Sequence, residues 1–302
     1  MSVPEAKSEE KRRSASQGAV AWRRFKKNRA GIVGMVMVGF VLFVAFLGYF
    51  FAPYAPRDFV CFQLGCTSLP PFQSWAHPLG TTPSGLDMYS EILHGARSDL
   101  YVGFGATLIA VAIGLVVGGL AGYRRGSSGA LLLGVTQVFL VLPLLILILL
   151  FSKIFQLTVA AGFGLTLIMV ILGVFGWPGV AYIARGEILR VRELEFVQAA
   201  RALGASNSRI LFRHIIPNIL PPIIVIATLT IAGNILTEVV ISFLGFGDPN
   251  TSTWGLLIQE GESWLNFWWI SFLPGIMVVF SVLGFNLLGD GLSDALNPRL
   301  RE

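Results

Sequence analysis

Long apolar segments recur along the chain, separated by shorter polar stretches. They run as continuous apolar stretches rather than alternating apolar and polar residues, and each is long enough to cross a bilayer core of about 30 Å as a helix. Only helices and closed barrels satisfy every backbone polar group in hydrocarbon, and continuous apolar runs favour helices. We therefore predict an all-α, polytopic membrane protein with six spans, at residues 30–51, 100–122, 131–151, 160–184, 219–246 and 270–288.

The composition supports this fold class and excludes several others. Of the 302 residues, 54% are hydrophobic and only 13% are charged, about half of the roughly 25% typical of soluble proteins. The mean hydropathy of +0.72 excludes a disordered chain and a coiled coil. Six spans occupy roughly 130 positions, so the remaining tails and loops are too short for a second large soluble domain.

The basic residues are distributed unevenly between the two sides of the predicted spans. Nineteen of the 22 Lys and Arg residues lie in the N-terminal tail, after the second span, between the fourth and fifth spans, or at the C-terminus. The opposite loops hold only Arg57, Arg97 and Lys153. By the positive-inside rule, both termini are expected in the cytoplasm. Because the basic residues flank apolar spans and form no basic domain face, we expect no nucleic-acid partner despite the net charge of +5.

Glycine and proline within the spans predict close packing and kinks. Small side chains allow helices to approach closely, which is expected at Gly114, Gly118, Gly119 and Gly122. Proline removes a backbone donor and crowds the preceding turn, so kinks are expected at Pro143, Pro178 and Pro274.

The chain lacks the motifs of an enzyme. No phosphate-binding loop ending in Gly-Lys-Ser/Thr is present, so any ATP that drives this protein must be hydrolysed by another chain. Ser128 lies in a Gly-x-Ser-Gly sequence resembling that of rhomboid intramembrane proteases. Such a serine needs a histidine on another span, whereas His77, His94 and His214 are expected in loops. With no His-Glu-x-x-His sequence either, we predict neither an enzyme nor a metal site.

Glu238 is the one acidic residue well inside a predicted span. A charge buried there without a partner costs a few kcal/mol, so it must be paired, protonated or exposed to water. Two alternatives follow: Glu238 and Asn234 line a translocation path, or Glu238 makes a structural hydrogen bond to Asn234, to Thr237 or to another subunit.

The two cysteines, Cys61 and Cys66, lie in one polar loop. They provide too few ligands for a closed structural zinc site. A local disulfide is possible if the loop lies outside the cell, and the sequence leaves this open.

The segment 187–217 between the fourth and fifth spans has an ordered character. Leu194, Val197 and Ala200, with Arg201 or Leu203, are spaced as one face of a helix over 193–203, which Gly204 is suited to end. Ser206 can cap a second helix over 207–216, before Pro217 starts the return into the membrane. The alternatives are a helical pair with one face free for a partner, or an interfacial helix held on lipid by Arg201, Arg209 and Arg213.

The same segment resembles the EAA loop of ABC importer permeases through Gln198-Ala199-Ala200, Gly204 and Ile215-Ile216-Pro217, although Gln198 stands where the family has glutamate. The resemblance implies contact with an ATPase through Glu195, Phe196, Gln198, Ala199, Ala200, Leu203, Gly204 and Ala205.

Four further blocks are similar to the second permease subunit of the dipeptide, oligopeptide and nickel transport family. They are His77-Pro78-Leu79-Gly80-Thr81 with Gly85 and Asp87; Gly95-Ala96-Arg97; Leu236-Thr237-Glu238 with Ser242-Phe243-Leu244-Gly245; and Asn286 to Leu292 with Asp294 to Arg299. Thr82, Leu86 and Ser293 depart from the family pattern.

This resemblance implies a type I importer permease in the bacterial or archaeal cytoplasmic membrane. It divides the chain into a cytoplasmic tail (1–29), a first span and extracytoplasmic loop (30–97), a five-helix core (98–290) and a C-terminal tail (291–302). The implied partners are a homologous permease, two ATP-binding subunits and an extracytoplasmic substrate-binding protein, with membrane lipid around them. ATP and Mg²⁺ are expected on the ATPases, with no cofactor on this chain. The alternative is an ion-coupled secondary carrier or channel that acts alone.

Overall fold

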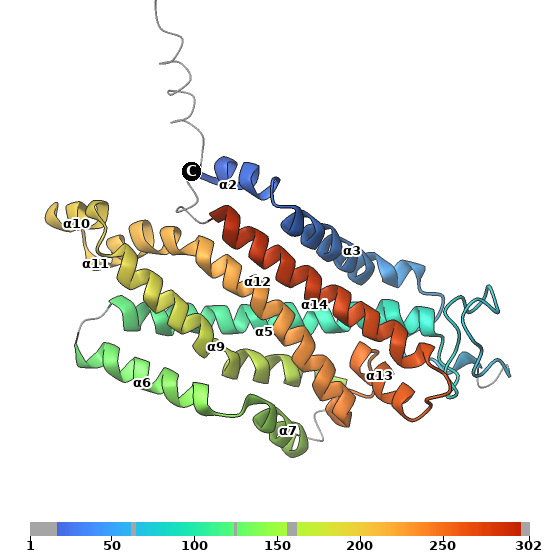
Figure 1. Ribbon diagram of the computed structural model, residues 1–302. Coiled ribbons are helices and arrows are strands. Elements are labelled where there is room, and N and C mark those ends of the chain that lie inside the picture. Colours follow the sequence, from blue (N-terminus) through green and yellow to red (C-terminus); the bar gives the residue numbers. More distant parts are fainter. Residues whose placement is uncertain (1–16, 62–64, 124–125, 156–161, 297–302) are drawn as a thin grey trace, which may run out of the picture.

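The structure is a computed structural model that describes residues 17–61, 65–123, 126–155 and 162–296. In these residues the chain is almost entirely helical, with one isolated β-bridge between Thr81 and Asp87. The long helices lie side by side along a common direction (Figure 1). The all-α prediction is confirmed. In chain order the elements are α2 (Gln17–Phe25), α3 (Arg29–Phe51), α5 (Met88–Tyr123), α6 (Ser127–Val141), α7 (Leu144–Ile154), α9 (Gly164–Val191), α10 (Glu195–Ala202), α11 (Asn207–Arg209), η2 (Ile210–Ile215), α12 (Ile216–Ile241), η3 (Ser242–Phe246), α13 (Trp254–Glu262) and α14 (Trp269–Leu296).

Among the residues that the structure describes, five helices are long and apolar enough to cross a membrane, and the pair α6 and α7 makes a sixth span if it is counted as one. The two helices of this pair are bent by 73°. Pro143 stands at the N-cap of α7 with extended backbone, so the kink predicted at this proline is a complete break. Pro178 and Pro274 lie inside α9 and α14 and end neither helix.

Several predicted span boundaries are wrong. Helix α5 begins at Met88 rather than near residue 100, and α9 continues to Val191 rather than ending at 184. The helix that was expected to end before Pro217 instead continues from Asn207 through Pro217 into the membrane span, until Gly245 interrupts it with a φ of +83°. A π-helical turn, η2, ends at Ile215, two residues before Pro217, and such a turn accommodates local irregularity without ending a helix.

The predicted N-terminal tail contains a helix that the sequence pattern did not predict. Helix α2 packs on α14, where the buried ring of Phe25 lies against Gly31 and Gly291. Asn28 then caps α3: its Oδ1 accepts a hydrogen bond from the Gly31 N–H at 2.9 Å, and its Nδ2 donates to Asp294 at 2.8 Å. The first span is therefore fixed to the end of the last one.

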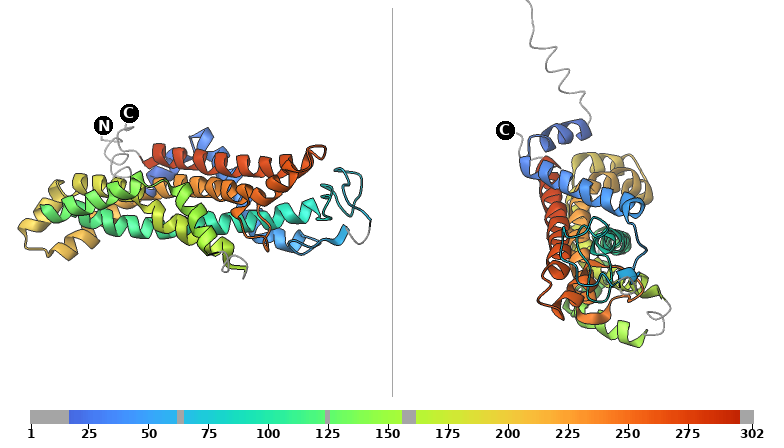
Figure 2. Two further views of the ribbon diagram at one scale, coloured as in Figure 1. Left: turned by 90° about the horizontal axis from the view of Figure 1, so that it is seen from below. Right: turned by 90° about the vertical axis from the view of Figure 1, so that its right-hand side faces the viewer.

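Helix α5 is the centre of the bundle and packs against α3, α9 and α12 (Figure 2). Glycine makes the closest of these contacts possible. A Cβ at Gly114 would lie 2.7 Å from the Cβ of Val180, and one at Gly118 would overlap the backbone of Ala181. Gly122 is also tight against α9, whereas Gly119 faces only the tip of Ile188 at 3.8 Å. The predicted close approach is confirmed at three of the four glycines.

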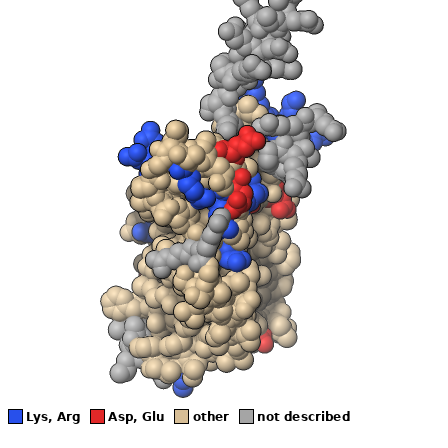
Figure 3. Space-filling model, turned by 90° about the vertical axis from the view of Figure 1, so that its left-hand side faces the viewer, with Lys and Arg blue, Asp and Glu red and all other residues tan. Residues whose placement is uncertain are grey.

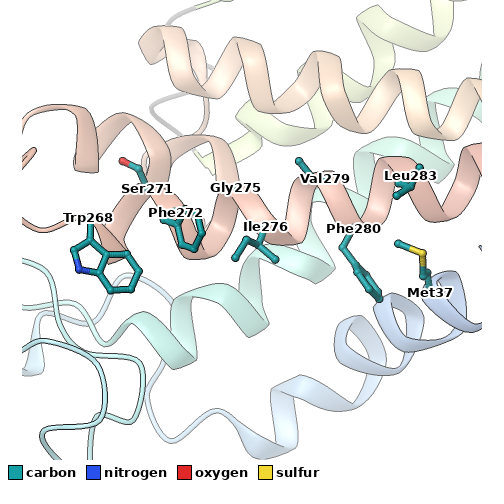
Figure 4. Close-up of a pocket in the computed structure, with 9 residues that line it drawn as sticks. All are labelled: Met37, Trp268, Ser271, Phe272, Gly275, Ile276, Val279, Phe280 and Leu283. Carbon is teal, nitrogen blue, oxygen red and sulfur yellow. The ribbon is translucent and has the colours of Figure 1, made fainter.

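The outer surface of the bundle is apolar over much of its length. An open groove of about 600 Å³ runs along α14 and is completed by Met37 of α3 (Figure 4). Its lining includes Phe272, Ile276 and Val279, all more than 40% exposed. An apolar surface of this extent is unfavourable in water and matches the hydrocarbon of a membrane.

Candidate functional site

Helices α10 and α11 lie at one end of the bundle, beyond the ends of the long helices (Figure 1). The loop between α3 and α5, with α13, occupies the opposite end. Lys and Arg side chains gather on the end that carries α10 (Figure 3). The segment singled out by the sequence is therefore a distinct surface feature at the basic end of the molecule.

Val197 is the one fully buried side chain of α10. It belongs to an apolar cluster with Ile188, Val191 and Ile210. Leu194 and Leu203, which were predicted to share its face, are 38% and 88% exposed. The predicted apolar face is thus wrong in part. The helix has only eight residues, and of the apolar residues assigned to that face only Val197 is fully buried.

The C-terminus of α10 has the geometry of a Schellman motif. The N–H of Ala205 donates to the carbonyl of Ala200 at 3.1 Å, and the N–H of Gly204 donates to that of Arg201 at 3.0 Å. Gly204 has a φ of +80°, a left-handed conformation that glycine adopts at low cost. Gly204 therefore ends the helix as predicted, and it does so by conformation, since a Cβ there would meet nothing within 4 Å.

Apolar side chains are exposed on α10 and at its C-cap, Leu203. Phe196 is 43% exposed, Leu203 is the most exposed of them, and Ala199 is also exposed. Gln198 instead turns back, and its Nε2 donates to the Arg192 carbonyl at 3.1 Å. The result is a small apolar surface on a helix held in a fixed position, with Glu195 in the first turn.

Hydrogen bonds connect this end to the long helices. Ser206 caps α11 as predicted, because its Oγ accepts from the Arg209 N–H at 3.4 Å. The hydroxyl of Tyr123, the last residue of α5, donates to Asn207 at 2.8 Å. Arg192, at the end of α9, donates to the Gly122 carbonyl at 2.8 Å. A displacement of α10 and α11 would therefore be transmitted to α5, α9 and α12.

Glu238 and Asn234 are both buried within this chain. The Oε1 atom of Glu238 accepts a hydrogen bond from Ser242 at 2.5 Å, so the expected partners, Asn234 and Thr237, are wrong. Asn234 donates to Thr107 of α5 at 3.0 Å, and Thr237 donates to the Gly233 carbonyl. Lining of a translocation path by Glu238 and Asn234 stays a prediction.

Asp99, which the sequence pattern did not single out, is fully buried beside Glu238. It falls just outside the second predicted span, because that span was started too late. The Oδ2 atom of Asp99 accepts from the backbone N–H of Trp254 at 3.3 Å. An earlier start of the span would have revealed two acidic residues in the apolar interior.

The remaining candidate residues lie away from α10. Cys61 and Cys66 are joined by a disulfide in the loop between α3 and α5. His94 lies in α5 and His214 in η2, so their predicted placement in loops is wrong, whereas His77 lies in a loop as predicted. Ser128 is exposed in the first turn of α6, and none of the hydrogen bonds of the described histidines reaches it.

Comparison with known proteins supports a role in membrane transport. Residues 114–302 match the model of the binding-protein-dependent transport system inner membrane component, and residues 16–71 match the N-terminal transmembrane domain of oligopeptide transport permease C. A dipeptide transport system permease protein of Bacillus subtilis is 37% identical over 97% of this chain and 89% of its own length. An oligopeptide permease of the same organism is 32% identical, over 96% and 92%. A glutathione transport permease of Pectobacterium atrosepticum is 32% identical, over 93% and 91%.

Proposed function

Because this chain belongs to the family of inner membrane components of binding-protein-dependent transport systems, we propose that α10 is the surface on which an ATPase subunit docks. The chain is a transmembrane permease subunit of an ABC importer and not an enzyme, and ATP hydrolysis is carried by partner subunits. The family assignment does not support a self-sufficient secondary carrier.

The observation that carries the proposal is the exposure of Leu203 and Phe196 on a helix fixed by one buried valine and a Schellman turn. Exposure of these apolar side chains to water is unfavourable, and insertion into an apolar pocket on a partner protein would remove them from water. The contact residues are those that the family resemblance implied: Glu195, Phe196, Gln198, Ala199, Ala200, Leu203, Gly204 and Ala205.

The orientation follows from charge. Arg185, Arg190, Arg192, Arg201, Arg209 and Arg213 all belong to the segment around α10, and α2 adds further basic residues. The positive-inside rule supports a cytoplasmic location for this end and for both termini. The loop between α3 and α5 is then extracytoplasmic, where a substrate-binding protein docks.

The assembled transporter contains this chain, a homologous permease, two ATP-binding subunits and a substrate-binding protein. ATP and Mg²⁺ bind to the ATPases, and transport requires no cofactor on this chain. Closure of the ATPases moves α10 and α11 as a rigid body, and the contacts of Tyr123 and Arg192 transmit this movement to the core. The names of the relatives support peptides or related small solutes as cargo.

Site-specific cross-linking tests the docking surface. In the assembled transporter, Leu203→Cys is expected to cross-link to an ATP-binding subunit through a short bifunctional thiol reagent. The control is Trp75→Cys, which is fully exposed in the loop at the opposite end. Cross-linking of Trp75→Cys but not Leu203→Cys to the ATPase would refute both the docking surface and the orientation.

A further inference from the structure

Three potential metal ligands meet inside the loop between α3 and α5. The Nε2 atom of His77 lies 3.2 Å from the Sγ of Cys61 and 3.6 Å from the Sγ of Cys66. Cys61 is fully buried and His77 is 4% exposed. Cys66 is half-buried, which leaves one side of the cluster open to small molecules. The proposed transport function uses none of these groups.

The imidazole of His77 is oriented by a buried carboxylate. Its Nδ1 lies 2.9 Å from Oδ1 of Asp87, which is 2% exposed. The Oδ2 atom of Asp87 accepts from the N–H and the hydroxyl of Ser90 at 2.9 and 2.7 Å, so the carboxylate cannot turn away. The ring of Tyr54 stacks on the imidazole at 5.5 Å. A histidine whose far nitrogen is held by a carboxylate is the usual arrangement of a metal-binding histidine.

The disulfide leaves the other nitrogen of this histidine without a donor. When Nδ1 donates its hydrogen bond to the carboxylate, the Nε2 of a neutral imidazole carries a lone pair directed at the two sulfur atoms. Disulfide sulfurs carry no proton to donate, and a buried acceptor without a donor is unfavourable. Two thiols, or a metal ion bound between thiolates and the imidazole, would satisfy Nε2.

The distances suit a small tetrahedral site. With Zn–S bonds of about 2.3 Å and Zn–N bonds of about 2.0–2.1 Å, a sulfur and a nitrogen on one zinc ion lie about 3.5 Å apart. The two observed S···N distances are 3.2 and 3.6 Å. Only the two sulfurs would have to separate, and they do so when their bond is reduced.

We propose that this cluster is a redox-controlled Zn²⁺ site. In the oxidised protein the disulfide occupies the sulfurs and excludes metal. A dithiol reductant transfers two electrons and two protons, forms its own disulfide and leaves thiols on Cys61 and Cys66. Zn²⁺ then displaces both thiol protons and binds the two thiolates and Nε2 of His77, with water in the fourth position. Thiolate and imidazole ligands select zinc over magnesium or calcium.

Either the disulfide or the metal would keep the loop folded. The Cys61 N–H donates to the Gly85 carbonyl at 3.0 Å, and the hydroxyl of Thr81 donates to the Cys66 carbonyl at 2.7 Å. The carbonyl of Thr81 in turn accepts from the indole N–H of Trp269 on α14. The cluster therefore links the loop to the last helix in both redox states. Zinc was discounted from the sequence because two cysteines alone are too few ligands, and nothing in their spacing places His77 beside them.

Metal retention by the full chain tests the proposal. The tag-free protein in lipid nanodiscs is treated with a trialkylphosphine, which reduces the disulfide to two thiols. The phosphine is oxidised to its oxide, and water supplies the oxygen atom and the two thiol protons. After incubation with Zn²⁺ and desalting, we expect one zinc per chain in the reduced protein and none in the untreated protein. Reduced protein whose thiols are alkylated before zinc is added is expected to retain none, a control that needs no substitution.

Variants and spectroscopy identify the ligands. His77→Gln is expected to abolish retention, whereas the matched His214→Gln, at the opposite end of the molecule, retains one zinc. Asp87→Asn is expected to weaken zinc binding about 10–100-fold, because it alters the partner that orients His77. Co²⁺ in place of Zn²⁺ is expected to give thiolate charge-transfer and tetrahedral d–d bands. Four results would each overturn the proposal. They are an equal zinc content before and after reduction, zinc retained by the alkylated protein, a cobalt spectrum without the thiolate charge-transfer band, and a disulfide that resists reduction in the folded protein.

Discussion

Asp99 of α5 and Glu238 of α12 place neighbouring carboxyl groups inside the bundle, where both residues are fully buried and close enough to repel each other if both are charged. Among the described residues, neither Asp99 Oδ1 nor Glu238 Oε2 has a hydrogen-bond partner. In that part of the chain no Lys or Arg forms an ion pair with either carboxyl. Two charges of one sign cannot both persist in an apolar interior, so the pair must hold at least one proton.

A shared proton predicts that the charge of Glu238 is dispensable but its shape is not. Glu238→Gln is expected to change the free energy of unfolding by less than about 1 kcal/mol, because the amide oxygen still accepts the hydrogen bond from Ser242 and the amide fills the same space. Glu238→Ala is expected to cost about 2 kcal/mol or more, because it leaves a cavity and an unpaired carboxyl. Equilibrium unfolding in detergent measures both. Equal destabilisation by the two variants would mean that the ionised carboxylate itself is required.

The left-handed backbone of Gly204 predicts uncoupling when it is replaced by a β-branched residue. An L-residue in this conformation costs about 1–2 kcal/mol, so Gly204→Val is expected to displace the end of α10. In vesicles that contain the assembled transporter, uptake should fall at least tenfold while ATP hydrolysis continues.

Two control variants separate conformation from bulk at this site. Gly204→Asn should retain most of the uptake, because asparagine tolerates left-handed backbone. Gly186→Val should also retain it, because Gly186 is exposed on α9 and a Cβ added there would meet no atom within 4 Å. Full uptake by Gly204→Val with normal assembly would count against the coupling role of α10.

The contact of Gly118 with α9 predicts a sharp difference between neighbouring glycines. A methyl group at Gly118 would overlap the Ala181 backbone, so Gly118→Ala is expected to destabilise the bundle by about 1–3 kcal/mol. Gly119→Ala meets only the tip of Ile188 at 3.8 Å and is expected to be neutral or slightly stabilising. Thermal unfolding of the two purified variants makes the comparison. A similar loss for both would show that helix flexibility, rather than close approach, explains these glycines.

The proposed orientation predicts which residues a membrane-impermeant thiol reagent can reach. In intact cells, Trp75→Cys should be labelled directly, whereas Leu203→Cys should be labelled only after the membrane is permeabilised. The unsubstituted chain serves as the control, because its two cysteines are joined in a disulfide. Labelling in the reverse order would place α10 outside and contradict the assignment made from the basic residues.

Patterns along the chain were enough to predict the fold class, the family and the short helix between the fourth and fifth spans. Continuous apolar runs leave the helix as the structure that satisfies the backbone in lipid. The glycine after α10 and the serine before α11 act through local backbone geometry, so their roles at Gly204 and Ser206 could be predicted without tertiary contacts. The positions of Gly114 and Gly118 likewise indicated close packing.

Which side chains meet could be learned only from the packed helices. The early start of α5 depends on Asp87, Ser90 and other residues of a packed loop, and no run of apolar residues marks it. The pairing of Asp99 with Glu238, and of His77 with Cys61 and Cys66, joins groups whose separation along the chain carries no information about their distance in space. Helix propensity and hydropathy depend on residues that are neighbours in the sequence, whereas the burial of a side chain and the residues it contacts depend on how whole helices pack. For this reason the helices could be predicted from the sequence, and the clusters of contacting side chains came only from the structure.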